Sequence, residues 1–541
     1  MTLQHRPGPD HIGPGACVHW FLRKPAVPAR IGGVTANANS SDTTSTVDNR
    51  DQRAVRLAKR QEILDSGKEA YPVGVRRTHS LATVREYWAH LASGEETDDV
   101  VGVVGRVVYQ RNTGKLCFAT LQEGGEDGST VQLQVMISLA EVGEEALEDF
   151  KHLVDLGDHV FFEGRVISSR RGELSIMAQR WEMASKALRP LPVLHADLNE
   201  ETRVRQRYAD LIVREEARQM IYKRAAITRA IRRVLESHGY VEVETPMLQL
   251  IHGGAAARPF ETHLNAFDQD MTLRIATELF LKRTVVGGVN RVYEMGRIFR
   301  NEGVDSTHSP EFTTLEFYEA YADQFVMAAR LKEIILAAAE EIGCGLQIPG
   351  PNGTTIDLSG DWAWVSVYPA LSEAVGREIT PETGIDVLKE VAAENNVAWD
   401  ENWDEQNAVI ELFGEIVEPT LINPTFVYDY PPAAQPLARP HRSKDGVIEA
   451  WDLIIGGMER GTAFSELIDP VIQRDRLTHQ SELAAGGDPE AMQLDEDFLR
   501  ALEYGAPPMG GTGLGVDRLV MLFTNVGIRE TILYPLLKPE A

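Results

Sequence analysis

Five strand-like runs between residues 98 and 184 constrain the fold of this chain more than any other feature. As a group they are rich in Val, Ile and Phe, and they read DVVGVVGRVVYQR, KLCFATLQ, TVQLQVMIS, GDHVFFEGRVISS and ELSIMAQRWEM. Polar turns with glycine separate several of them, and one helical stretch, SLAEVGEEALEDFKHLV, lies between the third and the fourth. The pattern predicts an all-β domain over residues 98–184 that one helical segment interrupts.

This order of elements is that of an OB-fold barrel. Such barrels bind single-stranded nucleic acid by stacking bases on aromatic side chains and by holding phosphates with basic ones. Phe118 is the candidate stacking platform, with Arg111 and Gln132 as contacts to base edges or phosphates. The alternative is that Phe118 belongs to the barrel core, since alternate residues of a strand point inward.

The length of 541 residues implies two to four domains. Residues 1–50 are rich in Gly, Pro, Ser, Thr and Asn, so we expect a disordered N-terminal extension. Residues 51–97 form a helical N-terminal segment that opens with a basic amphipathic helix, either a solvated charged face or a phosphate-binding arm. A linker at 185–202 leads to residues 203–541, whose mixture of strand-like and helical segments predicts an α+β domain.

The formal net charge of −27 means that any nucleic-acid partner must be held by local basic surfaces. Residues 203–233 reverse the sign, with ten basic against three acidic side chains, and form either a surface of packed helices or an RNA-facing or dimer-facing helix pair. No apolar run approaches about 18 residues, so we expect no membrane-spanning helix. Cys17, Cys117 and Cys344 lack metal-ligand spacing, which fits a reducing cytoplasm.

The common nucleotide-binding and metal motifs are missing from the sequence. It has no G-x-x-x-x-G-K-[ST] loop, and GTGLGV does not satisfy G-x-G-x-x-G because Val516 takes the place of the third glycine. It also has neither H-E-x-x-H nor paired C-x-x-C spacing. A nucleotide, if one binds, is held by a site of another kind.

Three further segments follow one another in the remaining part of the chain. They are LESHGYVEVETPML at 235–248, IFRNEGVDSTHSPEFTTLEFYEAYAD at 298–323 and GGTGLGVDRLVMLF at 510–523. In this order they resemble motifs 1, 2 and 3 of the class II aminoacyl-tRNA synthetases, and GGAAARPF, TELFLKR and EYGAPP make the match closer. With the OB-like domain in front, residues 51–538 resemble a class II lysyl-tRNA synthetase of bacterial type. The resemblance implies an α+β fold in which the OB-fold barrel precedes a catalytic domain built on an antiparallel sheet.

Amino-acid activation joins a carboxylate to the α-phosphate of ATP, so the site must neutralise charge and align the reactants. The resemblance assigns Arg300 to bridging the two groups, a task that suits the planar fork of arginine. It also implies that Arg518 holds the γ-phosphate at a helix start, where the field favours anions. The remaining ATP contacts that it implies are Glu302 to the adenine amine, Phe312 beneath the ring, His308 to the outer phosphates, and Glu459.

By the same resemblance, Asp452 and Glu459 in WDLIIGGMER hold Mg²⁺, which needs oxygen ligands beside the phosphates. Their spacing of seven residues places them on opposite faces of a simple strand. We therefore expect Gly456 and Gly457 to supply a bulge that brings both carboxylates to one face.

A lysine substrate brings two ammonium groups, and burying them requires partner carboxylates. The resemblance places Glu278 and the carbonyl of Gly254 at the α-ammonium, and Glu316, Tyr318 and Glu466 around the ε-ammonium. Arg300, Thr462 and Phe464 complete the implied lysine site. The alternative is that these glutamates are ordinary solvated charges.

The match to the family has gaps. Thr462 stands where the family often has Asn, and Thr307, His308 and Ser309 stand where it often has Arg-His-Asn, so Thr307 lacks a positive charge near the expected phosphates. The alternatives are an aspartyl or asparaginyl enzyme, a non-catalytic RNA-binding paralogue, and a lysine donor fused to a lipid-modifying membrane module. The glutamates would repel aspartate, which counts against the first alternative. The intact arginines count against a non-catalytic paralogue, and the missing membrane segment counts against the membrane-module fusion. The expectation is a cytoplasmic homodimer that uses ATP and Mg²⁺ to activate L-lysine and transfers it to tRNA(Lys).

Overall fold

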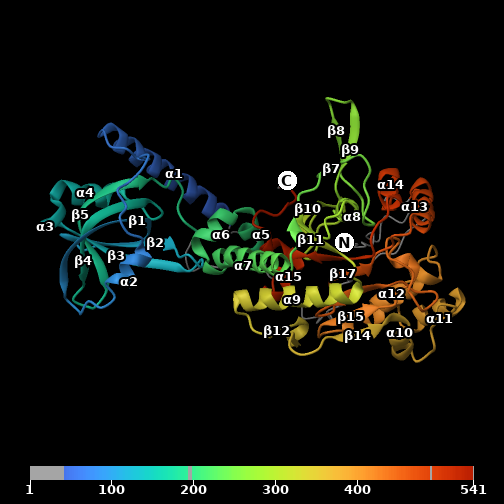
Figure 1. Cartoon of the computed structure of the whole chain (residues 1–541). Coiled ribbons are helices and arrows are strands. Elements are labelled where there is room, and N and C mark those ends of the chain that lie inside the picture. Colours follow the sequence, from blue (N-terminus) through green and yellow to red (C-terminus); the bar gives the residue numbers. More distant parts are fainter. Residues whose placement is uncertain (1–41, 193–197, 488–489, 540–541) are drawn as a thin grey trace. The chain divides into compact units, whose positions relative to one another are not determined.

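The computed structural model describes residues 42–192, 198–487 and 490–539 (Figure 1). They divide into two compact units, one within Pro28–Tyr222 and the other within Lys223–Ala541. Most of the expected N-terminal extension, residues 1–41, lies outside the described residues. No helix in the described part of the chain is long and apolar enough to cross a membrane.

The first unit is built around a closed five-stranded barrel with the strand order β1-β2-β3-β5-β4. Its strands are β1 (Glu96–Asn112), β2 (Leu116–Gly124), β3 (Thr130–Ser138), β4 (His159–Ser168) and β5 (Leu174–Ser185). Helices α3 (Leu139–Val142) and α4 (Glu144–Leu153) lie between β3 and β4, and α2 (Leu81–Tyr87) precedes β1. The predicted barrel and the position of its helical segment are confirmed.

Helix α1 (Asp42–Asp65) begins before the expected boundary at residue 51 and is fastened to the barrel unit by two of its basic side chains. Arg56 is buried and donates to the carbonyl oxygens of Leu156 and Ala187 at 2.9 and 3.2 Å. Lys59 forms an ion pair with Asp155 at 2.7 Å. These two cations therefore serve the packing of the helix, which leaves only the remaining basic residues of α1 for a phosphate-binding arm.

A buried lysine, Lys186, connects the chain after β5 to the loop before β4. The ammonium of Lys186 donates to the carbonyl oxygen of Leu153 and to the carboxylates of Asp155 and Asp158 at 2.6–2.7 Å. The side chains of Lys186 and Asp158 are fully excluded from solvent. Because an unpaired buried charge is costly, this cluster fixes the chain after β5 against the loop before β4.

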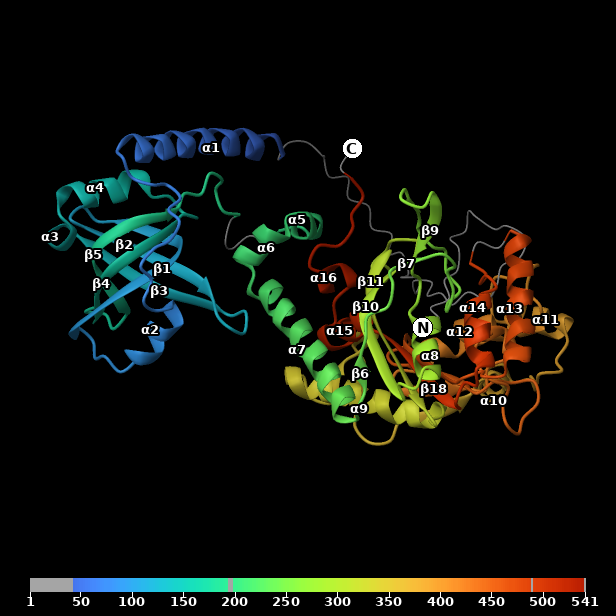
Figure 2. The same ribbon diagram turned by 45° about the horizontal axis from the view of Figure 1, so that its top comes forward.

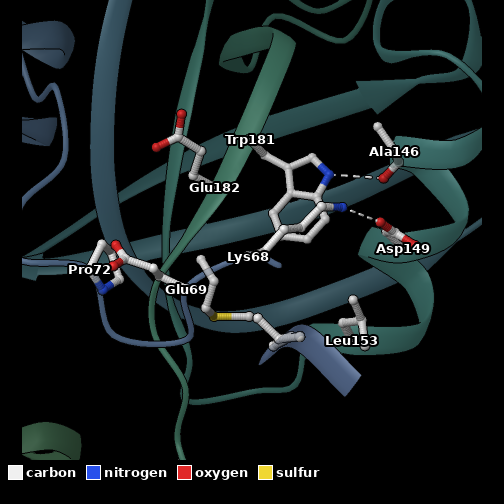
Figure 3. Close-up of a pocket in the computed structure, with 10 residues that line it drawn as sticks. Lys68, Glu69, Pro72, Ala146, Asp149, Leu153, Trp181 and Glu182 are labelled. Carbon is white, nitrogen blue, oxygen red and sulfur yellow. Dashed lines mark hydrogen bonds and ion pairs between the residues drawn. The ribbon is translucent and has the colours of Figure 1, made fainter. Parts of the chain in front are cut away.

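The segment that follows α1 contacts α4 and β5 (Figure 3). Trp181 donates from its indole nitrogen to the carbonyl oxygen of Ala146 at 2.8 Å, and Lys68 bridges to Asp149 at 2.6 Å. A cavity of about 330 Å³ lies between these elements, with Ile63 and Leu153 among its apolar lining. The segment after α1 is thus part of the barrel unit.

The second unit contains an eight-stranded sheet in the order β14-β15-β16-β17-β18-β11-β10-β6 (Figures 1 and 2). Its pairs are antiparallel except β14–β15 and β10–β6, which confirms the predicted antiparallel-rich α+β architecture. The strands are β6 (Val241–Glu242), β10 (Arg291–Phe299), β11 (Glu311–Ala320), β14 (Ala363–Ser366), β15 (Thr425–Tyr428), β16 (Ala450–Ile454), β17 (Glu459–Ser465) and β18 (Met509–Gly515).

Smaller elements surround this sheet. Two additional sheets are formed by β7 (Leu248–Gln249), β8 (Glu261–Leu264) and β9 (Gln269–Leu273), and by β12 (Gln347–Pro349) and β13 (Thr355–Asp357). The helices of the second unit are α8 (Glu278–Val286), α9 (Gln324–Ile342), α10 (Val367–Val375), α11 (Ile385–Glu394), α12 (Glu405–Ile416), α13 (Pro470–Ala485), α14 (Glu496–Glu503), α15 (Val516–Thr524) and α16 (Ile528–Thr531). Helices α5 (Glu200–Arg205) and α6 (Arg207–Val213) belong to the first unit, and α7 (Glu215–Ser237) runs across the boundary at Tyr222. Helices α10, α11 and α12 form an apolar cluster with β15 and β16.

Helix α9 covers one face of the large sheet. A Cβ atom on Gly510 would lie 2.9 Å from Met327 Cγ, and one on Gly461 would lie 3.2 Å from Leu331 Cδ2. The indole nitrogen of Trp451 in β16 donates to the carbonyl oxygen of Gln324 at 2.7 Å. Because side chains alternate along a strand, the neighbours of these residues point to the opposite face.

Replacing Lys186 with methionine should destabilise the barrel unit by about 3–5 kcal/mol, because Asp158 would remain buried without its cation. Hydrogen exchange of the peptides that cover β4 and β5 measures this loss. Lys68→Met is the matched control, since its ion pair with Asp149 is partly exposed and should contribute less than about 1 kcal/mol. Equal losses in the two variants would contradict the role given to Lys186.

Candidate active site

The face of the large sheet opposite α9 carries a row of directly paired residues. Glu316 in β11 pairs with Gly513 in β18, Gly513 pairs with Thr462 in β17, and Thr462 pairs with Asp452 in β16. Cross-strand partners point to the same face, so the three side chains share one surface, and Gly513 contributes none. The next row on that face contains Tyr318, Gly511 and Phe464. The sheet register thus brings together residues that are more than one hundred positions apart in the sequence.

Three glutamates converge beside this row. Glu278 is the first residue of α8, Glu316 lies in β11, and Glu466 directly follows β17; their exposed fractions are 0%, 0% and 3%. Burial raises the pKa of Tyr318 well above its ordinary value, and the carboxylates of Glu278, Glu316 and Glu466 reinforce this rise. The alternative that these glutamates are solvated charges is therefore wrong.

Hydrogen bonds orient Glu316 within the cluster. One carboxylate oxygen accepts from the backbone N–H of Thr277 at 3.2 Å, and the other accepts from the Tyr318 hydroxyl at 3.4 Å. Gly254 also lies here: its φ is +85°, and a Cβ atom at this position would lie 3.0 Å from Glu278 Cβ. A side chain at residue 254 would be both strained and crowded, so glycine allows the loop to approach Glu278 closely.

Lys282 is a member of this cluster that the sequence analysis missed. Its ammonium lies 2.6 Å from Glu278 Oε1 and forms a second ion pair with Glu466. The side chain is 1% exposed, and the nearby carboxylates raise its pKa although burial alone would lower it. The only signal in the sequence was the spacing of four residues from Glu278, which places both side chains on one helix face.

Arg300 lies between the glutamate cluster and a second acidic group. It is buried, donates to the carbonyl oxygen of Ile275 at 3.2–3.3 Å, and has its guanidinium carbon 5.5 Å from the centroid of the Phe312 ring. Burial lowers the pKa of Arg300 to about 10, while the charges of Glu316 and Glu459 oppose that change. Arg300 therefore remains a cation that faces both acidic groups.

Arg518 is the third residue of α15 and lies beside Glu459. Its guanidinium donates to the carbonyl oxygen of Glu459 at 3.1 Å and approaches Glu459 Oε2 at 3.6 Å. The preceding Asp517 anchors the helix start: its carboxylate accepts from the backbone N–H of Thr313 at 2.7 Å and from Arg224 at 2.5 Å. These bonds join α15 to β11 and α7, which fixes the position of Arg518 relative to the sheet.

The loop between β10 and β11 carries Glu302 and His308 and is held together by Asp305, which the sequence analysis did not identify. Asp305 Oδ1 accepts from the backbone N–H groups of Thr307 and His308 at 2.6 and 2.8 Å, and Oδ2 lies 2.9 Å from His308 Nδ1. Burial alone would raise the pKa of Asp305, but these hydrogen bonds lower it to about 2. The Thr307 hydroxyl also donates to Asp305, so this residue stabilises the loop without adding charge.

Asp452 and Glu459 do not share one strand, so the prediction of a single strand with a glycine bulge is wrong. Asp452 lies in β16 and Glu459 opens β17, and the two strands form a hairpin. Gly456 and Gly457 form its turn, with φ values of 68° and 67°. The ladder does shift register, but between Leu453 and Ile454. A spacing of seven residues suited either arrangement, and only the positive φ values require the turn.

The two carboxylates of this hairpin influence each other. Removal from water raises the pKa of Asp452, the Glu459 charge adds to this rise, and the hydroxyls of Thr462 and Tyr430 oppose it. Burial likewise raises the pKa of Glu459, against the charges of Arg518 and Arg300. Thr462 therefore faces Asp452 across the strand pair. Tyr430 also lies beside Asp452, and no sequence motif indicated it.

Comparison with known proteins identifies both parts of the chain. The model for the class II tRNA synthetases (D, K and N) matches residues 199–538, and that for the OB-fold nucleic acid binding domain matches residues 101–184. The chain belongs to the class II tRNA synthetases. The lysine–tRNA ligase of Kineococcus radiotolerans is 55% identical over 91% of this chain and 97% of its own length. That of Mycolicibacterium gilvum is 56% identical over 90% and 97%.

A third relative is longer than this synthetase. It is the lysylphosphatidylglycerol biosynthesis bifunctional protein LysX of Nocardia farcinica, which is 45% identical over 97% of this chain but only 46% of its own length. The likeness therefore covers about half of that protein.

The barrel of this synthetase places its three predicted nucleic-acid contacts on neighbouring strands. Phe118 is half-buried and lies between Cys117 and Ala119, which are fully buried, so the alternative that Phe118 belongs to the barrel core is wrong. Arg111 pairs with Phe118 across β1 and β2, with its guanidinium carbon 5.9 Å from the ring centroid. Gln132 on β3 donates to the Gln122 side chain on β2 at 3.0 Å.

The basic stretch at residues 203–233 divides into two kinds of side chain. Arg207 and Arg214 form ion pairs with the fully buried Asp210 at 2.9 and 2.6 Å, which is the packed-helix alternative. Arg229 and Arg233 are 65% and 58% exposed on α7 and pair with Glu341. The second group presents charge to solvent.

Replacing Gly511 with alanine should abolish amino-acid activation by this synthetase while ATP binding is largely kept. A Cβ atom at residue 511 would overlap both Glu466 Oε1 and the Tyr318 ring, so it would fill the space between these two side chains. Pyrophosphate exchange and separate measurements of nucleotide binding test this. Gly384→Ala is the control, because it has an ordinary φ and open space around its Cβ position. Normal exchange in Gly511→Ala would show that this space is not used.

Proposed function

We propose that this synthetase is a lysine–tRNA ligase. It joins L-lysine to ATP with release of pyrophosphate, and then transfers lysine from lysyl-adenylate to the 3′ end of tRNA(Lys) with release of AMP. The observation that carries the proposal is the cluster of three buried glutamates beside the buried Arg300. Such a cluster suits a substrate with two cationic groups and one carboxylate, because buried carboxylates need cationic partners and the buried Arg300 needs an anionic one. The names of the relatives from Kineococcus and Mycolicibacterium support it.

Lysine is oriented by its charged groups in this proposal. Glu278 and the Gly254 carbonyl bind the α-ammonium, Glu316, Tyr318 and Glu466 bind the ε-ammonium, and Thr462 and Phe464 line the cavity. Arg300 grips the carboxylate against the α-phosphate, which aligns an oxygen for in-line attack on phosphorus. The support for this arrangement is the position of Arg300 between Glu316 and Glu459.

ATP binds across the other half of the sheet in this proposal. Phe312 lies beneath the adenine ring, Glu302 accepts from the adenine amine, and His308 and Arg518 hold the outer phosphates. Arg518 is suited to its role because α15 fixes it at a helix start, where the helix field favours anions. As pyrophosphate leaves, these fixed cations stabilise the charge that develops on it.

The acidic hairpin fits a magnesium ion. Glu459 Oε1 is buried and accepts no hydrogen bond from the residues that the structure describes, and the raised pKa values of Asp452 and Glu459 call for a nearby cation. Two carboxylates are the usual protein share of a Mg²⁺ site whose other ligands are phosphate oxygens and water. Within the described ranges, no group of three or more metal-binding side chains competes with it. Bound Mg²⁺ would neutralise phosphate charge.

The barrel is proposed to read the anticodon of tRNA(Lys). Phe118 would stack on a base, with Arg111 and Gln132 as its polar contacts. The exposed arginines of α7 and the adjoining first motif suit the homodimer interface of the class. Cys117 and Cys344 are free thiols, which agrees with a cytoplasmic location.

The proposal is tested by pyrophosphate exchange with each of the twenty amino acids, in the presence of ATP and Mg²⁺. We expect exchange with lysine and none with aspartate or asparagine, because a second carboxylate would be repelled and a neutral amide would leave a buried glutamate without its cation. Exchange with aspartate or asparagine instead would identify a sister enzyme. No exchange with any amino acid would favour a non-catalytic RNA-binding paralogue.

Glu466→Gln should raise the KM for lysine by about 10- to 100-fold, the range expected for a lost charged hydrogen bond. The KM for ATP should change by less than about threefold, because Glu466 lies at the lysine end of the site. Steady-state kinetics with each substrate varied in turn measures both. Equal increases in the two constants would contradict the assigned pocket.

The use of lysine should rise with pH. Burial raises the pKa of Glu466 to about 8; Lys282 opposes this shift and Glu278 adds to it. Below that pH the carboxyl is protonated and cannot pair with an ammonium group, so kcat/KM for lysine should increase from about pH 6.5 to about pH 8.5. The same profile in Glu466→Gln would show that another group titrates.

A further inference from the structure

Lys282 belongs to the glutamate cavity although it is not among the groups proposed to bind substrate. It lies one helical turn after Glu278 on α8, and its ammonium contacts both Glu278 and Glu466. The second contact joins α8 to the end of β17, two elements that are far apart in the sequence. The position of Lys282 therefore sets the separation between two of the three carboxylates.

The ammonium of Lys282 contributes to the charge balance of this cluster. The side chains of Glu278, Glu316 and Glu466 are all buried. A lysine substrate would bring two ammonium groups to these three carboxylates. Lys282 supplies the third ammonium, while Arg300 pairs with the substrate carboxylate. A buried carboxylate that lacked such a partner would cost several kcal/mol.

One carboxylate oxygen remains for the substrate after Lys282 has made its contacts. Lys282 forms an ion pair with Glu466 Oε2, and the buried Oε1 takes no part in that ion pair and accepts no hydrogen bond from any residue in the described ranges. Oε1 points toward Gly511, where a Cβ atom would overlap it. Lys282 thus contacts one carboxylate oxygen of Glu466, and the other oxygen faces the space that Gly511 leaves open.

We propose that Lys282 is a specificity-determining positioning residue: its ammonium neutralises one equivalent of carboxylate, orients Glu278 and Glu466, and so makes the cavity selective for a substrate with two ammonium groups. This inference rests on the proposed function. Lys282 acts through the two glutamates and does not contact the reacting atoms.

A purely structural ion pair is the rival explanation, and Arg283 provides the matched control. Arg283 is the next residue of α8 and pairs with Asp495 and Asp497, which lie at the start of α14 and outside the cavity. Lys282→Met and Arg283→Met each remove one cation from the same helix. Loss of stability alone would affect both variants, whereas loss of charge balance would affect only the first.

The test measures pyrophosphate exchange by the full-length protein, with thermal unfolding recorded for every variant. Lys282→Met should raise the KM for lysine by about 10- to 100-fold, with the KM for ATP nearly unchanged. Arg283→Met should leave both constants within about threefold of wild type. Lys282→Arg keeps the charge and should recover part of the loss.

The double variant Lys282→Met/Glu466→Gln separates charge balance from packing. It removes one carboxylate together with its cation, so two carboxylates again face two substrate ammonium groups. We expect it to use lysine at least about fivefold better than Lys282→Met does, although it carries one more substitution. The double variant also lacks the carboxylate of Glu466, which Lys282 pairs with in the wild type. It therefore remains informative if Lys282→Met folds poorly.

The possible outcomes are distinct. A double variant no better than Lys282→Met, or equal effects of Lys282→Met and Arg283→Met on the KM for lysine, would overturn the role of Lys282 while leaving the proposed function intact. Wild-type protein that does not exchange with lysine would overturn the proposed function and, with it, this inference.

Discussion

The cost of burying three carboxylates in one cluster governs the architecture of the catalytic unit. Isolated buried carboxylates would protonate or remain in water, so the fold must bring cations to them. The charged groups come from three separate elements: α8 carries Glu278 and the cation Lys282, β11 carries Glu316, and β17 leads into Glu466. These elements reach one another only because β17 and β11 both pair with β18. The sheet order is therefore a requirement of the electrostatics as well as of the fold.

Glycine on β18 makes the cavity possible. In the middle of a sheet glycine weakens the strand, so its repeated use in Met509–Gly515 calls for an explanation. Gly511 provides it, because any side chain there would enter the space between Tyr318 and Glu466. On the opposite face, Gly510 and Gly461 let α9 approach the sheet closely. The same strand thus leaves space beside Glu466 and Tyr318 on one face and lets a helix pack closely against the other.

Sequence reasoning predicted the fold and most of the candidate site by different routes, and the structure confirms the fold. The barrel followed from strand patterns alone, because five short β-branched runs and a helix after the third permit few arrangements. The glutamates followed from motif resemblance, which carries their positions but not their partners. Lys282 and Asp305 were missed because their roles depend on contacts that spacing does not reveal: the link from Lys282 to Glu466 spans more than 180 residues. Asp452 and Glu459 were placed on one strand because seven residues fit a bulged strand or a hairpin equally well.

The arrangement of charge across the sheet explains how two anionic reactants can meet. The glutamate cavity and the Asp452–Glu459 pair are both acidic, and Arg300 lies between them with Arg518 beyond it. An amino acid held by its ammonium groups in the first acidic region presents its carboxylate toward Arg300. A triphosphate approaching the second region meets Arg518 and any cation that the carboxylate pair holds. In the proposed arrangement both anions face the same arginine, and the direction in which lysine would bind follows from which acidic region holds its ammonium groups.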